Sequence, residues 1–452
     1  MVYSTNMNKR QKTSKEGCSE EVGLETRGKQ KVSSELLAVP IQKAKSEVDT
    51  ENLLERVVNK RNLYEAYKRV KRNKGSNGID GMRVDELLPY LQQNVDTLIS
   101  NLLNGKYRPN PVRRKEIPKP NGGIRLLGIP TVIDRLVQQA IAQVVNDIFD
   151  KDFSDNSYGF RPNRSAHMAL EKSIEYINDG YRYVVDMDLE KFFDTVNHDI
   201  LMALIARKIK DKRLLKLIRR FLNSGILVNG VVVSNEDGAP QGGPLSPLLS
   251  NIMLDELDKE LEKRGHKFVR YADDSNIYVK SKRAGHRVLQ NITKFLEGNL
   301  KLKVNQQKSD VASLIKRKFL GYSYYYTRDG AKLRVHKKSY ERLKEKIRKL
   351  TNRNISMNFN YRLKKLKEII VGWVNYYKLA NMGDKLRHID SWIRRRLRAC
   401  IWKTWKKVKT RFKNLAKLGV PKYKAWEYAN TRKGYWRISK SCKCQSQNAQ
   451  KL

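Results

Sequence analysis

The stretch Phe268-Val269-Arg270-Tyr271-Ala272-Asp273-Asp274-Ser275-Asn276-Ile277-Tyr278-Val279 carries apolar runs near both ends and two adjacent carboxylates in its centre. Two apolar runs separated by a short polar segment predict a β-hairpin, with Asp273 and Asp274 at its tip. The alternative interpretation is an ordinary solvated turn, because aspartate is common in turns whatever their function. The fold prediction depends on this stretch more than on any other.

A second acidic strand is predicted upstream, over residues 183–189, where apolar residues surround Asp186 and Asp188. These two carboxylates share one face because side chains alternate along a strand. Placed beside the hairpin, they would form a site for divalent metal ions. Phosphoryl transfer to a nucleotide uses two such ions, and Mg²⁺ needs only one or two carboxylates from the protein.

The composition indicates a polyanionic partner. The chain of 452 residues has 93 Lys and Arg against 47 Asp and Glu, and its formal net charge of +46 is typical of nucleic-acid-binding proteins. No uninterrupted apolar stretch reaches membrane-spanning length, so we expect a soluble protein with no membrane partner. Residues 1–50 lack the pattern of a secretory signal or a transit peptide. The four cysteines indicate a reducing compartment and no disulfide framework.

The positive charge is concentrated towards the C-terminus. Residues 331–452 contain 36 Lys and Arg, 6 Asp and Glu, and all six tryptophans of the chain. Apolar residues recur there at helical spacing, in runs that begin at Leu343, Leu363 and Leu386, which predicts a small helical bundle with one basic face. Residues 1–50 are predicted to form a disordered polar tail, whereas residues 51–330 alternate helical and strand patterns.

A series of sequence blocks carries a clear family resemblance. The blocks are Lys115–Arg125, Ser157–Pro162, Asp188–Asp194, Gln241–Pro247, Tyr271–Asp274, Leu302–Asn305, Phe319–Tyr322 and Gly372–Tyr377. In this order they resemble the reverse-transcriptase and thumb (maturase) regions of group II intron-encoded proteins. The short chain is similar in particular to the compact bacterial class C subgroup, and the resemblance covers about residues 51–440.

The resemblance implies an α+β multidomain fold of the right-hand polymerase type, with fingers, a ferredoxin-like palm and a helical thumb. After the tail, we expect an N-terminal extension and fingers over residues 51–178. The palm, with inserted finger elements, is expected over 179–332 and the helical thumb or maturase (X) domain over 333–408. Residues 409–452 would form a basic appendage that resembles a DNA-binding region, with a tail.

The resemblance also assigns the acidic residues. Asp188 matches the first catalytic aspartate of the family, so Asp186 becomes a supporting carboxylate. Two Mg²⁺ ions are implied as cofactors. The implied catalytic residues and metal ligands are the carboxylates of Asp188, Asp273 and Asp274, with the Leu189 carbonyl as a backbone ligand.

Phe193 follows Asp188 at the spacing of the family's aromatic gate, which blocks the 2′-hydroxyl of a ribonucleotide. If this assignment holds, the product is DNA rather than RNA. The alternative is that Phe193 is an ordinary core residue, because the adjacent Phe192 is equally bulky.

Further residues are expected to contact the incoming nucleotide. Arg and Lys side chains suit the charge of a triphosphate. The candidates are Lys119, Arg125, Arg161, Gln241 and Lys308, of which Lys308 would protonate the departing pyrophosphate. The alternatives are a solvated hairpin around Lys119 and Arg125, an ordinary loop glutamine at position 241, and Lys301 or Lys303 in place of Lys308.

The implied function is an RNA-directed DNA polymerase that also assists the splicing of its intron RNA. Its expected partners are intron RNA, an RNA template paired with a DNA primer, dNTPs and target DNA, in the bacterial cytoplasm near the nucleoid. Asn62–Met82 resembles the family's N-terminal extension and template-binding insertion, although a plain fingers helix and loop would also fit. Cys442 and Cys444 are too closely spaced for a zinc site, so we expect no endonuclease domain.

Two other classes of protein remain open at this point. One is a reverse transcriptase of another retroelement or of a defence system. The other is a maturase that folds RNA but has lost polymerase activity. The complete set of Asp188, Asp273, Asp274, Phe193 and Gln241 argues against this loss.

Overall fold

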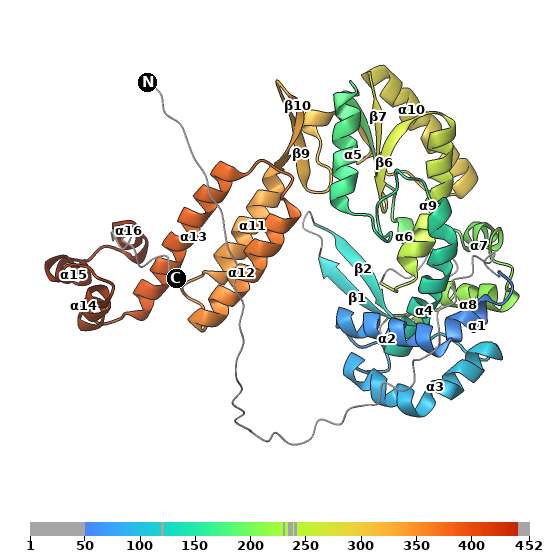
Figure 1. Cartoon of the computed structure of the whole chain (residues 1–452), viewed down its shortest axis with the longest axis horizontal. Coiled ribbons are helices and arrows are strands. Elements are labelled where there is room, and N and C mark those ends of the chain that lie inside the picture. The colour runs from blue at the N-terminus through green and yellow to red at the C-terminus, as the bar shows by residue number, and fades with distance from the viewer. Residues whose placement is uncertain (1–49, 119–121, 229–230, 234–237, 239–241, 442–452) are drawn as a thin grey trace, which may run out of the picture. The chain divides into compact units, whose positions relative to one another are not determined.

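The computed structural model describes residues 50–118, 122–228, 231–233, 238 and 242–441 (Figure 1). The predicted N-terminal tail and the positions of Lys119, Gln241, Cys442 and Cys444 lie outside these residues. Within the described residues, no helix is both long and apolar enough to cross a membrane.

A four-stranded antiparallel sheet forms the centre of the predicted palm. It contains β3 (Tyr183–Met187), β6 (Lys267–Tyr271), β7 (Asp274–Val279) and β8 (Asp310–Ser313), in the order β6-β7-β3-β8. The first and third strands of the chain are therefore central, and the second and fourth lie at the edges. This order confirms the ferredoxin-like arrangement.

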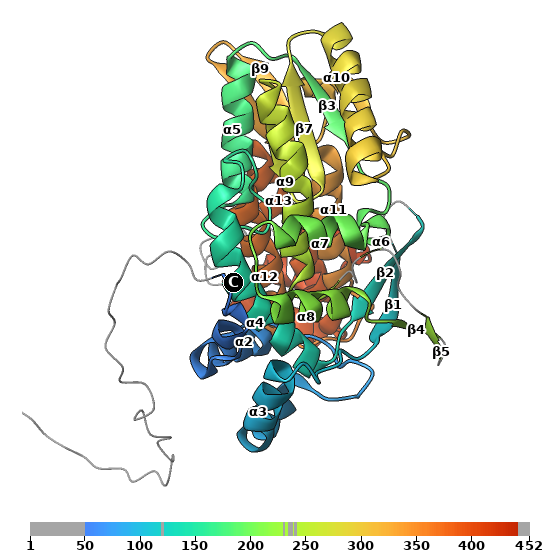
Figure 2. The same cartoon turned by 90° about the vertical axis from the view of Figure 1, so that its right-hand side faces the viewer.

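Three long helices pack against this sheet or support it. Figure 2 shows them beside strands β3 and β7: α5 (Ala166–Asn178) contacts β6, α10 (Lys282–Phe295) contacts β3 and β8, and α9 (Ser246–Lys263) also contacts β6. Helix α9 buries Leu248, Ile252, Leu257 and Leu261 together with several polar residues. It is therefore enclosed on more than one side.

The N-terminal part of the described chain combines helices with a small sheet. Its helices are α1 (Leu53–Val58), α2 (Lys60–Asn73), the 3₁₀ turn η2 (Val84–Glu86), α3 (Leu87–Leu103) and α4 (Val132–Phe149). The sheet contains β1 (Val112–Pro118) and β2 (Ile124–Ile129). Two strands from later in the chain, β4 (Ile226–Val228) and β5 (Val231–Val233), complete it in the order β2-β1-β4-β5. Strands β1 and β2 form the hairpin predicted around Gly122 and Gly123.

Eight further elements precede residue 337 within the described residues. They are η3 (Asp150–Asp152), α6 (Phe192–Thr195), α7 (His198–Ala206), α8 (Lys212–Leu222), the π-helical turn η4 (Leu296–Leu300), η5 (Leu314–Lys316), β9 (Tyr322–Thr327) and β10 (Gly330–Val335). Strands β9 and β10 pair with each other as a separate antiparallel hairpin.

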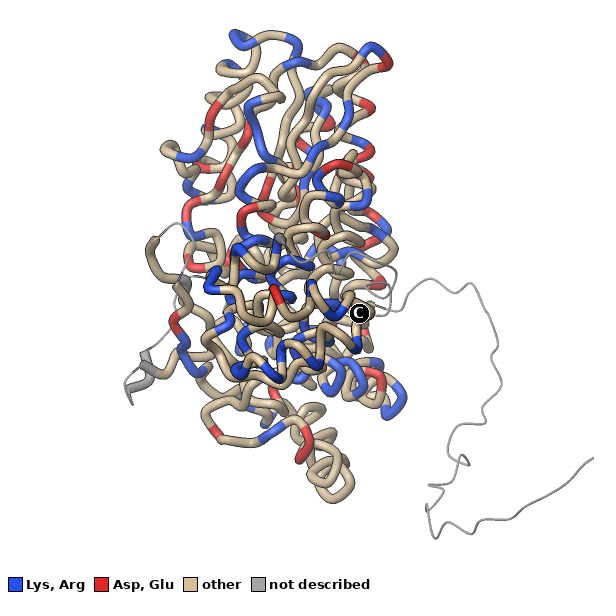
Figure 3. The backbone as a smooth tube through the Cα atoms, turned by 90° about the vertical axis from the view of Figure 1, so that its left-hand side faces the viewer, with Lys and Arg blue, Asp and Glu red and all other residues tan. Residues whose placement is uncertain are grey.

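The C-terminal part of the described chain is helical, as the spacing of its apolar residues predicts. Helices α11 (Lys337–Leu350), α12 (Phe359–Tyr376) and α13 (Gly383–Thr404) share a core of Leu343, Ile347, Leu366, Ile389 and Ile393. Helices α14 (Val408–Lys417), α15 (Lys422–Ala429) and α16 (Tyr435–Ser441) form a second core around Trp402 and Leu415. Figure 3 faces these helices and shows many Lys and Arg but few acidic residues along them.

The end of helix α12 is tied to the turn before β9. The Tyr376 hydroxyl donates to the Leu320 carbonyl at 2.9 Å, and the Tyr322 hydroxyl donates to the Tyr376 carbonyl. Gly321 has φ +87° in this turn, a left-handed conformation that glycine adopts most easily. The blocks that contain Leu320 and Tyr376 are therefore in direct contact.

Candidate active site

The acidic hairpin forms at the predicted place. Strands β6 and β7 pair with Tyr271 opposite Asp274, which leaves only Ala272 and Asp273 in the turn. Ala272 has φ +59°, which is uncommon for a residue with a side chain. Asp273 and Asp274 are both exposed at this tip.

Strand β3 brings the upstream carboxylates to the same place. It pairs with β7 so that Asp186 lies opposite Asn276 and Met187 lies opposite Ser275. One further step along this antiparallel register places Asp188 beside Asp274. Residues far apart in the sequence thus meet at one end of two central strands.

The carboxylates influence one another's ionisation. Protein atoms around the Asp274 carboxyl, and then the negative charges of Asp273, Asp186 and Asp188, raise the pKa of Asp274 to about 6, although the residue as a whole is exposed. The pKa of Asp186 is also raised, mainly by burial and against the opposing effect of Arg317. Both raised pKa values are consistent with an excess of negative charge at this place, which a bound cation would neutralise.

The donor set fits Mg²⁺ only in part. Within the described residues, no group of three or more His, Cys, Asp or Glu side chains is arranged to hold a metal ion. Mg²⁺ in nucleotide-handling sites takes one or two carboxylates and completes its shell with water and substrate phosphate. The adjacent hard oxygen donors of Asp188 and Asp274 suit that requirement, and their role as ligands stays a prediction.

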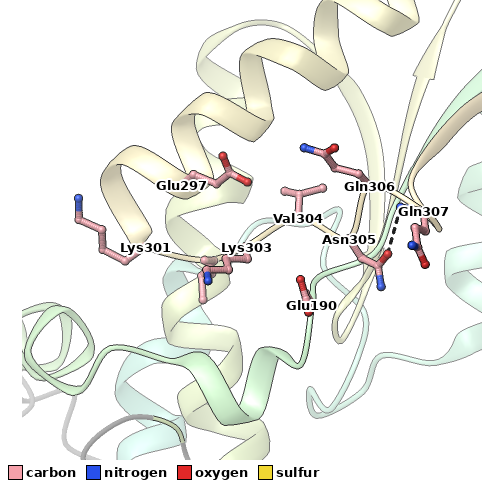
Figure 4. Close-up of a pocket in the computed structure, with 9 residues that line it drawn as sticks. Glu190, Glu297, Lys301, Lys303, Val304, Asn305, Gln306 and Gln307 are labelled. Atoms are coloured by element: carbon pink, nitrogen blue, oxygen red, sulfur yellow. Dashed lines mark hydrogen bonds between the residues drawn. The ribbon is translucent and has the colours of Figure 1, made fainter. Parts of the chain in front are cut away.

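Lys308 lies directly at this acidic group. Its Nζ atom is 2.8 Å from Asp188 Oδ2, and the Asn305 amide donates to the Asp188 carbonyl at 2.9 Å. Lys301 and Lys303, the alternatives to Lys308, instead line a neighbouring cavity of about 840 Å³ with Glu190 and Glu297 (Figure 4). Of these three lysines, all within the described residues, only Lys308 forms an ion pair with a predicted catalytic carboxylate.

Leu189 and Phe193 follow Asp188 on the same segment. Leu189 faces Val304 in an isolated bridge, but the bonds there run from Glu190 N to Lys303 O and from Asn305 N to Asp188 O. The Leu189 carbonyl is thus not used by this bridge. The Phe193 ring is half-buried and contacts the ring of Phe192, which is fully in the core.

Arg161 is held tightly within its own loop. Its side chain is only 4% exposed, and its Nε atom pairs with Asp150 Oδ1 at 2.7 Å. Its other nitrogens donate to the carbonyls of Asp150, Ser154 and Ser157. The guanidinium thus holds its own loop, and the predicted contact of Arg161 with a nucleotide stays a prediction.

Two predicted nucleotide-binding residues lie outside the described residues: Lys119 and Gln241. Arg125 lies in β2, opposite Ile117, and nothing is described of its side chain. The hairpin that carries Lys119 and Arg125 is present, but their contact with a nucleotide stays a prediction.

Sequence reasoning missed two arginines that support the acidic group. Arg317 lies 3.5 Å from Asp186 Oδ2 and 2.5 Å from Asp310 Oδ2, so it bridges two strands of the sheet. Arg270 is fully buried beneath the hairpin tip and pairs with the equally buried Asp258. Its position could have been suspected, because Arg270 shares a strand face with the apolar Phe268.

Comparison with known proteins identifies two regions of the chain. Residues 117–324 match the family model described as reverse transcriptase (RNA-dependent DNA polymerase). Residues 340–419 match the model of the group II intron, maturase-specific domain. The two matches follow one another in the order that the sequence blocks predict.

Relatives include the protein YkfC of Escherichia coli (strain K12) and the group II intron-encoded protein LtrA of Lactococcus lactis subsp. cremoris. The first is 35% identical over 272 residues, covering 52% of this chain and 71% of YkfC. The second is 39% identical over 248 residues, covering 53% of this chain and 40% of LtrA. The chain therefore matches less than half the length of LtrA.

Among solved structures, a partial Cas6-RT-Cas1–Cas2 complex is similar at 24% sequence identity. The match has a TM-score of 0.35 and covers 54% of this chain and 42% of that one. A similarity of this size carries no argument about function.

Proposed function

Because the chain belongs to the group II intron reverse transcriptase and maturase family, we propose that it copies RNA into DNA and assists the folding of its intron RNA for splicing. The observation that carries the polymerase activity is the meeting of Asp188, Asp273 and Asp274 at one end of β3 and β7. Carboxylates gathered in this way suit a site for nucleotidyl transfer.

We propose that Asp188, Asp273 and Asp274, with the Leu189 carbonyl, hold two Mg²⁺ ions. When bound, the ions would supply activation of the primer 3′-hydroxyl and neutralise charge on the leaving pyrophosphate. The new bond joins the primer 3′-oxygen to the α-phosphorus of a dNTP, and the bond from that phosphorus to pyrophosphate breaks. Lys308, already beside Asp188, is suited to protonate the pyrophosphate.

Selection of the nucleotide would be shared between the template and the protein. Base pairing with the RNA template chooses the base, so the protein need only recognise shape and backbone. Phe193 would exclude the 2′-hydroxyl of a ribonucleotide, and Lys119, Arg125 and Gln241 would contact the dNTP from the β1–β2 hairpin and the loop before α9. The half-buried position of the Phe193 ring, beside the core residue Phe192, supports the gate.

The basic helices would hold nucleic acid beside this site. Residues 331–452 carry 36 Lys and Arg against 6 Asp and Glu, which suits the RNA–DNA duplex and the intron RNA. Helices α14 to α16, with their separate core, would contact target DNA. The match of residues 340–419 to the maturase-specific domain favours an intron protein over another retroelement or a defence enzyme.

Substitution of Asp273 tests the proposed activity. Asp273→Ala should lower Mg²⁺-dependent primer extension on an RNA template by more than about a hundredfold, because even second-sphere changes cost ten- to a hundredfold. Intron RNA binding, measured by filter retention, should change little, because the basic surfaces are untouched. Asp329→Ala serves as the control, since Asp329 is an exposed acid that pairs with Lys332.

The outcome separates the candidate functions. Equal loss of extension and of RNA binding in Asp273→Ala would contradict separate sites. A wild-type protein that binds and folds intron RNA but extends no primer would identify a maturase without polymerase activity.

A further inference from the structure

The direction of the two tip carboxylates depends on the backbone of a two-residue turn. Ala272 immediately precedes Asp273 and adopts φ +59°, a region that an L-residue occupies rarely and only when its surroundings impose it. Gly159 lies against this turn from one side. A Cβ atom on Gly159 would lie 2.2 Å from the Ala272 amide nitrogen, so the backbones are in close contact.

Arg270 holds the same turn from below. Its Nη1 atom donates to the Ala272 carbonyl at 3.0 Å and to Asn251 Oδ1 at 2.9 Å. Its Nε and Nη2 atoms donate to the Asp258 carboxylate at 2.8 and 2.5 Å. The Arg270 and Asp258 side chains are both fully buried. The guanidinium is therefore held by helix α9 and has no contact with solvent.

The network closes on the other side of the turn. Asn251, also on α9, donates from Nδ2 to the Gly159 carbonyl at 2.9 Å. One residue of α9 thus contacts both the guanidinium that holds Ala272 and the glycine that packs against it. The turn lies between these two fixed supports.

We propose that Arg270 is a positioning residue for nucleotidyl transfer. Its guanidinium links helix α9 to the Ala272 carbonyl and so fixes the Asp273 and Asp274 carboxylates for metal binding. This inference rests on the proposed polymerase function. Lysine cannot replace arginine in this role, because a single ammonium cannot serve Asp258, Asn251 and Ala272 in the fork geometry of a guanidinium.

A purely structural role predicts something different. A buried ion pair that only supports the fold would, when broken, lower the thermal unfolding midpoint without a specific effect on metal affinity. A positioning role predicts weaker metal binding in protein that is still folded and still binds nucleic acid.

The test measures metal binding without turnover. Wild-type protein and Arg270→Lys are assembled with an RNA template, a DNA primer ending in a dideoxynucleotide, and the next dNTP. Mn²⁺ affinity is read from the electron paramagnetic resonance signal of free Mn²⁺, below the unfolding temperature of each variant. We expect Mn²⁺ affinity to fall about ten- to a hundredfold in Arg270→Lys, as for other second-sphere residues, with unchanged affinity for the template–primer duplex.

Two further variants make the test specific. Gly159→Ala pushes on Ala272 from the other side without touching the ion pair, and should weaken Mn²⁺ binding in the same way. Asp211→Ala removes a buried cap that accepts from the amides of Leu54, Arg213 and Leu214. This control should lower the unfolding midpoint but leave the Mn²⁺ affinity within about twofold of the wild-type value. A change that small is distinct from the ten- to hundredfold loss expected for Arg270→Lys.

Each outcome bears on the proposal. Normal Mn²⁺ affinity in Arg270→Lys, or an equal loss in Asp211→Ala, overturns the positioning role while leaving the polymerase function in place. Wild-type protein that binds Mn²⁺ no more tightly than Asp273→Ala overturns the proposed metal site and this inference with it.

Discussion

Phe192 and Phe193 are adjacent phenylalanines with different environments. Phe192 is 3% exposed and belongs to the core, whereas the Phe193 ring is only partly covered by that core. Phe193→Ala should therefore increase ribonucleotide incorporation, on the order of ten- to a hundredfold, because it removes the ring that we propose excludes a 2′-hydroxyl. Primer extension with competing rNTPs and dNTPs measures the ratio.

Phe192→Ala is the matched comparison. It should lower the unfolding midpoint through the cavity it leaves, with little change in sugar selection. Equal selection by wild type and Phe193→Ala would remove the gate assignment.

At this scale the sequence predicted where the acidic residues meet, for a physical reason. Asp188, Asp273 and Asp274 follow strand patterns whose period fixes the face on which each side chain lies. The burial of Arg161 and Arg270 was not predicted, because burial of an arginine depends on distant partners. Asp150 satisfies the first and Asp258 the second, and neither pairing has a local sequence signal.

The turn at Leu320 and Gly321, which precedes β9, contacts the end of helix α12. Gly321→Ala should lower the unfolding midpoint for two reasons. The left-handed φ of +87° costs about 1–2 kcal/mol for a residue with a Cβ atom. In addition, the new Cβ would lie 2.4 Å from the Tyr377 hydroxyl.

Gly180 allows these two costs to be separated. It has φ +90°, but a Cβ there would meet no atom within 4 Å. Gly180→Ala should therefore show the conformational cost alone, and Gly321→Ala a larger loss of stability. Equal effects in thermal unfolding would contradict the proposed contact between this turn and Tyr377.

Among the helices and strands, local sequence patterns predicted some elements, whereas pairings between distant segments could not be predicted. The β6–β7 hairpin and helices α11 to α13 follow from alternation and helical spacing in the sequence. The parallel pairing of β1 with β4 joins segments that are far apart in the chain, and no periodicity within either segment specifies it. The short strands β4 and β5 also give too few residues for a clear pattern.

The whole molecule is dominated by its net charge of +46. Its affinity for intron RNA should fall steeply with salt, because each neutralised phosphate releases counterions, with a slope of about −0.7 per contact on single strands. With that slope, about six to ten contacts would weaken binding by roughly three hundredfold to ten thousandfold between about 50 and 200 mM salt. A dissociation constant that does not change over this range would contradict the role of the basic helices.

Composition predicts the kind of partner at this scale but not its identity. The charge excess, the tryptophans and the helical spacing of residues 331–452 are visible in the sequence, and Figure 3 shows the resulting basic helices. The ferredoxin-like strand order came from the family resemblance, since no local pattern specifies which strands become central.

We propose above all that Asp188, Asp273 and Asp274 bind the ions used in nucleotidyl transfer. The most direct measurement is an anomalous-difference map from crystals of the protein with Mn²⁺, a dideoxy-terminated primer on an RNA template, and a dNTP. We expect Mn²⁺ peaks coordinated by these carboxylates and by the phosphates of the dNTP. Peaks elsewhere, with the three carboxylates free of metal, would contradict this assignment of the metal ligands.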